Sequence, residues 1–139
     1  QIPLAPKPAA SVKTKKRVLV VDDVVDNRAI ICAALKAEGY EIIEADGGAA
    51  AIEEIARTRP DLVLLDLMMP EVDGFAVIKK VRGEMGMADL PIIVITAMSE
   101  ADSQALALEV GSDDYMTKPF NPKVLRARVK AQFRRTEYA

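Results

Sequence analysis

The sequence contains no histidine and no tryptophan, and its only cysteine is Cys32. Without histidine, the chain cannot carry a Ser-His-Asp or Cys-His catalytic apparatus, an imidazole base or a histidine-ligated metal site. A single cysteine also excludes an internal disulfide. Any catalysis by this chain must therefore use carboxylates, hydroxyl groups or lysines.

The charge balance and the hydrophobic content indicate a globular domain. Nineteen Lys and Arg residues stand against twenty-one Asp and Glu residues, and a formal net charge of −2 gives no general attraction to nucleic acid or an anionic membrane. Hydrophobic residues make up 50% of the chain, but runs such as Val18 to Val21 are far too short to span a bilayer. We expect no direct nucleic-acid binding, no membrane association and, with so little cysteine, a reducing cytoplasmic location.

Residues 1–16 differ in composition from the rest of the chain. They hold three of the eight prolines and several alanines and lysines, without the apolar centre of a signal peptide. We interpret 1–16 as a linker or tail, 17–135 as the folded domain and 136–139 as a C-terminal tail. We expect no effector domain after the last helix, and an opening Gln1 in place of Met suggests a segment cut from a larger protein.

Short apolar runs alternate with helical patterns five times from Arg17 onward. The predicted strands are 17–22, 40–45, 61–66, 90–97 and a short fifth strand at 113–117. The run 61–66 is apolar at consecutive positions, which is typical of a strand buried on both faces of a parallel sheet. Since parallel strands need crossovers that cover both faces, the pattern predicts a (βα)₅ doubly wound α/β domain with a five-stranded parallel sheet.

Capping residues predict where the intervening helices begin and end. We expect Asp26 or Asn27 to cap the first helix, and Gly39 to end it. Ser99 forms a possible capping box with Asp102 at the start of the fourth helix, which should end at Gly111. Asn121 should cap the fifth helix, with Pro122 at its first position.

Polar groups follow four of the five predicted strands. Asp22 and Asp23 end the first strand, Asp66 the third and Thr96 the fourth, and Lys118 follows the fifth. Ligand sites in such sheets form outside the carboxyl ends of the strands. Each group alone is more simply a cap, a turn residue or a solvated loop charge. Their convergence from four strand ends favours a common site.

Three carboxylates at one edge of a sheet repel one another unless a cation neutralises them. Oxygen ligands without histidine or cysteine suit Mg²⁺, which typically takes one or two carboxylates, water and a phosphate. Lys118 would add a second positive charge and Thr96 a hydroxyl donor. The set predicts a Mg²⁺ and phosphoryl site in which Asp66 is the available nucleophile.

These residues carry a resemblance to a known family. The stretch from Arg17 to about Arg135 resembles a response-regulator receiver domain, the CheY-like phosphoacceptor module of two-component signalling. The matching segments are VLVVDD, LLDLMMPEVDGF around Asp66, ITA at Thr96 and GSDDYMTKPF. The resemblance implies a flavodoxin-like or CheY-like sheet with strand order 2-1-3-4-5.

The resemblance also implies a role for each site residue. Asp66 would be the phosphoacceptor, while Asp22 and Asp23 would hold Mg²⁺ or Mn²⁺ together with the backbone carbonyl of Met68. Of the two, Asp23 would bind directly and Asp22 through water. Lys118 would pair with the phosphoryl group. The donor would be a partner histidine kinase or phosphotransfer protein, because this chain has no histidine to carry phosphate.

A second group of implied roles concerns signalling. Thr96 would move toward the phosphoryl group, and Tyr115 would turn inward into the space that Thr96 vacates, which changes the face formed by the fourth helix, fifth strand and fifth helix. The alternative for Tyr115 is a half-buried aromatic with its hydroxyl in water. The Lys118-Pro119 peptide bond resembles the family's cis bond.

Two methionines flank the predicted site. Met68 follows Asp66 by two residues, and Met98 follows Thr96 by two. We expect their apolar side chains to hinder water and so prolong the life of an aspartyl phosphate.

Other functions are weighed against the same residues. A pseudo-receiver that binds proteins without being phosphorylated does not need the complete set at the strand ends. A dehalogenase-type phosphatase carries an Asp two residues after its nucleophile, where this chain has Met68. A flavodoxin-type FMN site needs a Ser, Thr or Gly-rich first loop in place of DDVVDN.

Charge separates along the last third of the chain. Residues 99–114 contain five acids and no base, whereas 121–135 contain six bases and no acid. These are most simply two solvated helix faces. Their similarity to OmpR/PhoB-type receivers instead suggests a homodimer through the fourth helix, fifth strand and fifth helix, which phosphorylation would favour.

Overall fold

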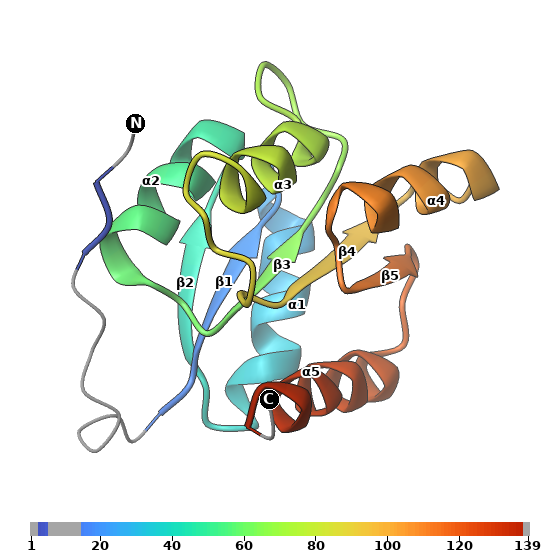
Figure 1. Cartoon of the computed structure of the whole chain (residues 1–139). Coiled ribbons are helices and arrows are strands. Elements are labelled where there is room, and N and C mark those ends of the chain that lie inside the picture. Colours follow the sequence, from blue (N-terminus) through green and yellow to red (C-terminus); the bar gives the residue numbers. More distant parts are fainter. Residues whose placement is uncertain (1–2, 6–14, 138–139) are drawn as a thin grey trace.

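The structure is a computed structural model that describes residues 3–5 and 15–137 (Figure 1). Five parallel strands form one sheet in the order β2-β1-β3-β4-β5, which confirms the predicted doubly wound topology. The elements in chain order are β1 (Arg17–Val21), α1 (Val25–Lys36), β2 (Glu41–Ala45), α2 (Gly48–Thr58), β3 (Leu62–Leu65), α3 (Gly74–Arg82), β4 (Ile92–Thr96), α4 (Ala101–Val110), β5 (Asp114–Thr117) and α5 (Pro122–Glu137).

Each face of the sheet is buried beneath its own set of helices (Figure 1). In β3, Leu62 and Leu64 pack with residues of α1 and α5, whereas Val63 and Leu65 pack with residues of α2, α3 and α4. Because successive strand residues point to opposite faces, both sets must be apolar. This explains the continuous apolar runs that predicted a buried parallel sheet.

The predicted N-caps of α1 and α4 are wrong, whereas the predicted end of α4 at Gly111 and the predicted cap of α5 are confirmed. Helix α1 begins at Val25 after Val24, because the Asp22 side chain accepts the Val24 N–H and makes the turn that Asp26 or Asn27 was expected to make. It ends at Lys36, where the amides of the next turn bond back to the last carbonyls, so Gly39 lies beyond the helix. Helix α4 follows Glu100, and no side chain caps it. The Asn121 side chain does accept the Lys123 amide at the start of α5.

The structure describes only part of each end of the chain. Leu4 packs against the core beneath α2, and the Ala5 amide donates to the Ala56 carbonyl at 2.8 Å. Residues 1–2 and 6–14 of the predicted linker lie outside the described residues, as do 138–139. Helix α5 continues to Glu137.

Two glycines hold the loop after β3 tightly against the domain. A Cβ atom on Gly48, the first residue of α2, would lie 2.1 Å from the Val72 carbonyl oxygen. A Cβ atom on Gly74 would lie 2.4 Å from the Asp66 carbonyl oxygen. Both positions therefore require glycine so that the loop carrying Asp66 can close onto α2 and α3.

Gly48→Ala is expected to lower the free energy of unfolding by about 2 kcal/mol, because the added methyl group meets a backbone carbonyl that cannot move cheaply. The matched control is Gly47→Ala, where nothing lies within 4 Å of the added Cβ. As a change at the helix N-cap, it should cost less than about 1 kcal/mol. Urea denaturation of both variants measures the difference, and equal losses would contradict this account of the loop.

Candidate functional site

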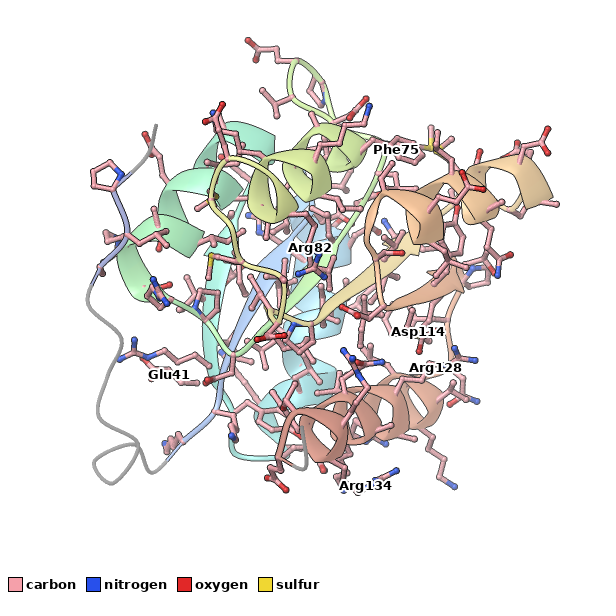
Figure 2. All side chains as sticks on the ribbon, in the orientation of Figure 1. Glu41, Phe75, Arg82, Asp114, Arg128 and Arg134 are labelled. Atoms are coloured by element: carbon pink, nitrogen blue, oxygen red, sulfur yellow. The ribbon has the colours of Figure 1, made fainter. Side chains whose placement is uncertain are left out.

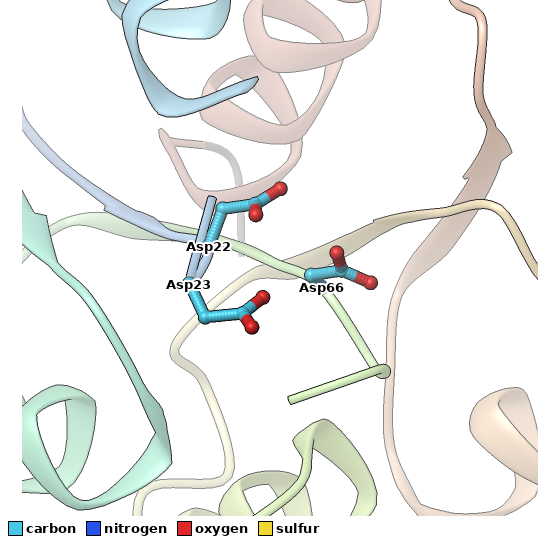
Figure 3. A group of neighbouring side chains, drawn as sticks. All are labelled: Asp22, Asp23 and Asp66. Carbon is cyan, nitrogen blue, oxygen red and sulfur yellow. The ribbon is translucent and has the colours of Figure 1, made fainter. Parts of the chain in front are cut away.

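Three carboxylates meet at the carboxyl end of the sheet, as predicted. Asp22 and Asp23 follow β1 and Asp66 follows β3, and one oxygen of each lies within 4.8 Å of the others. Figure 3 shows the three side chains gathered side by side. Asp22 and Asp66 are buried, whereas Asp23 is exposed. The cluster is thus closed on the protein side and reaches solvent through Asp23.

Lys118, which follows β5, bridges the two buried carboxylates. Its Nζ lies 2.6 Å from Asp22 Oδ2 and 2.9 Å from Asp66 Oδ2. Burial alone would lower the pKa of Lys118, but the hydrogen bonds to the two carboxylates outweigh it and hold the pKa above its ordinary value. The Lys118-Pro119 bond is cis, as the resemblance implies, and the Lys118 amide donates to the Thr96 carbonyl. Lys118 is thus a charged donor held between β1 and β3.

The second oxygen of each buried carboxylate accepts a main-chain amide two residues further along the chain. Asp22 Oδ1 lies 2.9 Å from the Val24 nitrogen, and Asp66 Oδ1 lies 3.1 Å from the Met68 nitrogen. Among the described residues, none donates a hydrogen bond to the Asp23 carboxylate. The two buried groups are therefore oriented in advance, whereas Asp23 keeps its lone pairs free.

Thr96 and Tyr115 occupy the neighbouring strands β4 and β5. Thr96 is fully buried, and its Oγ1 accepts the Met98 amide at 3.4 Å. Tyr115 is 7% exposed, and its hydroxyl donates to the Met98 carbonyl at 2.6 Å. Burial raises the pKa of Tyr115, and the negative charges of Glu100 and Asp66 raise it further. Tyr115 therefore lies inward in this structure, with its hydroxyl bonded to the loop after β4.

The two methionines differ in their surroundings. Met68 is 56% exposed beside the Asp66 carboxylate, to which its amide donates. Met98 is half-buried and packs against the core beneath α2, α3 and α4. Met68 is thus the more exposed of the two, whereas Met98 lies in the loop whose main chain bonds Thr96 and Tyr115.

Sequence reasoning missed Arg28, which lies on α1. Its Nη1 donates to the Asp22 main-chain oxygen at 2.7 Å, and its Nε donates to Glu44 Oε1 at 3.0 Å. The only signal for it in the sequence is a basic residue one helical turn into the helix that follows the acidic pair, which is also common on a solvated helix face. The contact with β2 appears only in three dimensions.

The donor set fits a hard divalent cation. The ligand atoms are carboxylate oxygens, none comes from sulfur or imidazole, and they are close enough together to share one ion. Asp23 is exposed and free of other hydrogen bonds, which leaves it able to bind an ion directly. Fold and site together define a doubly wound α/β domain with a cluster of carboxylates at the carboxyl end of its sheet that could hold a cation.

Comparison with known proteins identifies the family. Residues 18–130 match the response regulator receiver domain. The chain is 44% identical over 121 residues to the phosphate regulon transcriptional regulatory protein PhoB of Pseudomonas aeruginosa, covering 87% of this chain and 53% of that protein. It is 42% identical over 125 residues to the probable transcriptional regulator ycf27 of Porphyridium aerugineum, covering 90% and 51% respectively. The chain therefore belongs to the receiver domains of two-component response regulators.

Solved structures agree with this assignment. A CheY-like receiver domain protein from Methanospirillum hungatei superposes with a TM-score of 0.84 at 26% identity, over 90% of this chain and 98% of that one. The BeF3-activated N-terminal receiver domain of Klebsiella pneumoniae RstA gives 0.80 at 34% identity, over 86% and 99%. The chain spans about half the length of the curated relatives it matches. Within residues 3–5 and 15–137, no helix has the length and apolar character needed to cross a membrane.

Lys118→Gln is expected to lower the free energy of unfolding by about 3 kcal/mol at neutral pH, because two buried carboxylates lose the cation between them. Adding Asp66→Asn to this variant should restore part of the loss. Lys80→Gln, which removes the surface pair between Lys80 on α3 and Glu84 just after this helix, is the control and should change little. Urea denaturation measures the free energy of unfolding of all three variants. An unchanged value for Lys118→Gln would contradict the stabilising role of the Lys118 bridge.

Lys118→Gln also tests how the stability of the protein depends on pH. Since the pKa of Lys118 is raised on folding, its stabilising contribution is fully present below its ordinary pKa and is lost as pH rises through the raised value. Wild-type protein should therefore lose more stability than Lys118→Gln above about pH 10.5. Parallel curves for the two proteins would contradict this assignment.

Proposed function

We propose that Asp66 accepts a phosphoryl group and that Asp22 and Asp23 hold Mg²⁺ or Mn²⁺ beside it. The observation that carries the proposal is the buried Asp66 carboxylate, held between two further carboxylates and the Lys118 ammonium. A bound divalent ion supplies positive charge that offsets the three carboxylates and the phosphoryl oxygens. The Met68 backbone carbonyl would complete the set of protein ligands.

The transfer step follows from the chemistry of the acceptor. A carboxylate oxygen of Asp66 attacks the phosphorus of a phosphohistidine on a histidine kinase or phosphotransfer protein. The P–N bond breaks, its electron pair goes to the imidazole with a proton, and an aspartyl phosphate forms on Asp66. Lys118 Nζ, now 2.9 Å from Asp66 Oδ2, is placed to donate to a phosphoryl oxygen instead. The phosphodonor must be a separate domain or molecule because this chain has no histidine.

The response would be read through Thr96 and Tyr115. The Thr96 hydroxyl is buried at the end of β4, and phosphorylation would give it a charged acceptor to bond. The Tyr115 hydroxyl already bonds the Met98 carbonyl in the loop that Thr96 also bonds. We therefore assign the inward position of Tyr115 to the signalling arrangement of the α4-β5-α5 face. After phosphorylation, the hydrogen bond between the Tyr115 hydroxyl and the Met98 carbonyl would be favoured.

An exposed apolar rim beside the site suits a protein donor. Val24 and Val25 at the start of α1, Ile30 on α1 and Met68 beside Asp66 are 46%, 64%, 56% and 56% exposed. Burying these side chains against a partner would favour the encounter. A soluble cytoplasmic location, in which the buried Cys32 thiol stays reduced, is part of the same proposal.

Incubation with acetyl phosphate and Mg²⁺ is expected to give a hydroxylamine-labile adduct on the wild-type chain. Asp66→Asn should abolish it, because no carboxylate then stands at the acceptor position. Intact-mass spectrometry measures the adduct, and Asp73→Asn, which removes the charge but keeps an oxygen acceptor at the N-cap of α3, is the matched control that should still be labelled. No adduct on the wild type would favour the pseudo-receiver, and steady hydrolysis of varied phosphoesters would favour a phosphatase.

Met68→Asn and Met98→Ala are expected to lose the phosphoryl group several-fold faster than the parent, since each removes apolar cover from the path of attacking water. Met68→Leu keeps that cover and should behave like the parent. The decay of the adduct after removal of acetyl phosphate measures the rate. If Met68→Asn and Met98→Ala both lost the phosphoryl group at the parent rate, the two methionines would have no role in protecting it.

We also propose that phosphorylation favours a homodimer through α4, β5 and α5. Two of the arginines of α5 are already paired within the chain: Arg128 lies 2.7 Å from Asp114 (Figure 2), and Arg135 lies 3.0 Å from Asp113. Helix α4 buries only Ala107 fully and leaves Leu106 and Leu108 more than two-fifths exposed. The exposed leucines of α4 are therefore a stronger reason for a dimer than the charges are.

Adding beryllofluoride and Mg²⁺ is expected to shift the chain from monomer to dimer in sedimentation velocity experiments. Leu106→Asp should prevent the shift by placing a charge in the contact, whereas Ile30→Asp, at an equally exposed apolar position on α1, should not. An unchanged sedimentation coefficient of the wild-type chain would count against the dimer.

A further inference from the structure

Arg28 reaches from α1 to the last peptide of β1. Its side chain is only 15% exposed, although it lies on a surface helix. Nη1 donates to the Asp22 carbonyl oxygen at 2.7 Å, while Nε donates to Glu44 Oε1 on β2 at 3.0 Å. The guanidinium group is thus held at two points by groups from two different strands.

The carbonyl that Arg28 holds belongs to the peptide joining Asp22 to Asp23. On its other side Asp22 is fixed by its amide, which donates to the Ala45 carbonyl at 3.2 Å, and by its carboxylate, which bonds Val24 and Lys118. Asp23 has no such bonds among the described residues. The direction of the Asp23 side chain therefore depends on the orientation of the peptide plane that precedes it, which Arg28 sets.

Glu44 gives the arrangement its charge balance. An unpaired guanidinium beside the acidic cluster would compete with a cation for the same carboxylates. The Glu44 carboxylate pairs with that guanidinium and also fixes the plane of its fork. Arg28 can therefore orient the acidic pair without adding an uncompensated positive charge to the site.

We propose that Arg28 is a positioning residue that sets the affinity of the Asp22 and Asp23 pair for a divalent cation. This inference rests on the proposed function, in which that pair holds Mg²⁺. Groups that orient metal ligands typically change affinity by 10- to 100-fold when they are removed. Arg28 acts through the main chain of Asp22 and does not itself touch the ion.

The chain supplies a matched control at the other end of the same strands. Arg17 at the start of β1 also donates Nε to a β2 glutamate, Glu41 at 3.2 Å, and Nη1 to a main-chain oxygen, that of Thr58 at 2.8 Å. Glu41 begins β2, at the end of the sheet opposite the acidic cluster, and is labelled in Figure 2. Arg17→Gln therefore removes the same chemistry without touching the site.

The test is a Mg²⁺ titration of the full chain, followed by the NMR amide shifts of Val24 and Met68, with urea denaturation of each variant. Arg28→Gln is expected to raise the half-saturating Mg²⁺ concentration by about 10- to 100-fold, and Arg17→Gln by less than about twofold. Arg28→Lys, which keeps the charge but not the two-point fork, should fall between wild type and Arg28→Gln. It also serves as the test variant if Arg28→Gln does not fold.

A second readout separates positioning from general damage. The rate of Asp66 labelling by acetyl phosphate in Arg28→Gln should approach the wild-type rate at saturating Mg²⁺ and fall below it at limiting Mg²⁺. If the half-saturating Mg²⁺ concentration of Arg28→Gln lay within twofold of the wild-type value, or rose equally in Arg17→Gln, the role of Arg28 would be overturned while the proposed function would stand. A wild-type chain that neither binds Mg²⁺ nor is labelled would overturn the proposed function together with this inference.

Discussion

The ammonium group of Lys118, held between two buried carboxylates, is the interaction on which the rest of the site depends. Asp22, Asp66 and Lys118 follow β1, β3 and β5, so the bridge forms only if these three strands end at the same edge of the sheet. Burying two like charges together is costly, and one cation shared between them offsets that cost. The same balance makes the site responsive. A divalent cation that enters would compete with Lys118 for the carboxylates, whereas a phosphoryl group would give the ammonium a new acceptor. In either case the loop that carries Lys118 must adjust.

The surrounding structure holds the carboxylates of Asp22 and Asp66 rigidly but leaves helix α4 free to move. Close backbone contacts at Gly48 and Gly74 press the loop after β3 onto α2 and α3, and main-chain amides fix one oxygen of each buried carboxylate. By contrast, α4 buries only Ala107 fully, and the loop that precedes it carries the Met98 carbonyl that accepts the Tyr115 hydroxyl. A rigid acceptor beside a weakly packed helix is the arrangement that a two-state switch requires, because a small change at the acceptor can shift the helix without unfolding the core.

The sequence predicts the fold and the site where the signal is local and repeated. Continuous apolar runs identify the buried strands, and since parallel strands end together, the polar residues that follow them must meet. The start of α1 was mispredicted because the Asp22 side chain, committed to the site, also makes the turn that a helix cap would make. The contact of Arg28 with Asp22 and the Tyr115–Met98 hydrogen bond could not be predicted for another reason: each depends on a carbonyl that points in a particular direction, and no residue pattern encodes that. The pairing of Asp113 and Asp114 with α5 within one chain was missed because charge runs do not reveal their partners.

The proposed function requires that Asp22, Asp23 and Asp66 form one divalent-cation site, distinct from the acidic segment around α4. Paramagnetic broadening by substoichiometric Mn²⁺ tests it directly, because the loss of NMR signal falls off steeply with distance from the bound ion. With the ion at this site, the amide signals of residues 22–24 and 66–68 should disappear first, and excess Mg²⁺ should restore them. Broadening centred on the acidic segment around α4, or spread evenly over the surface, would contradict it.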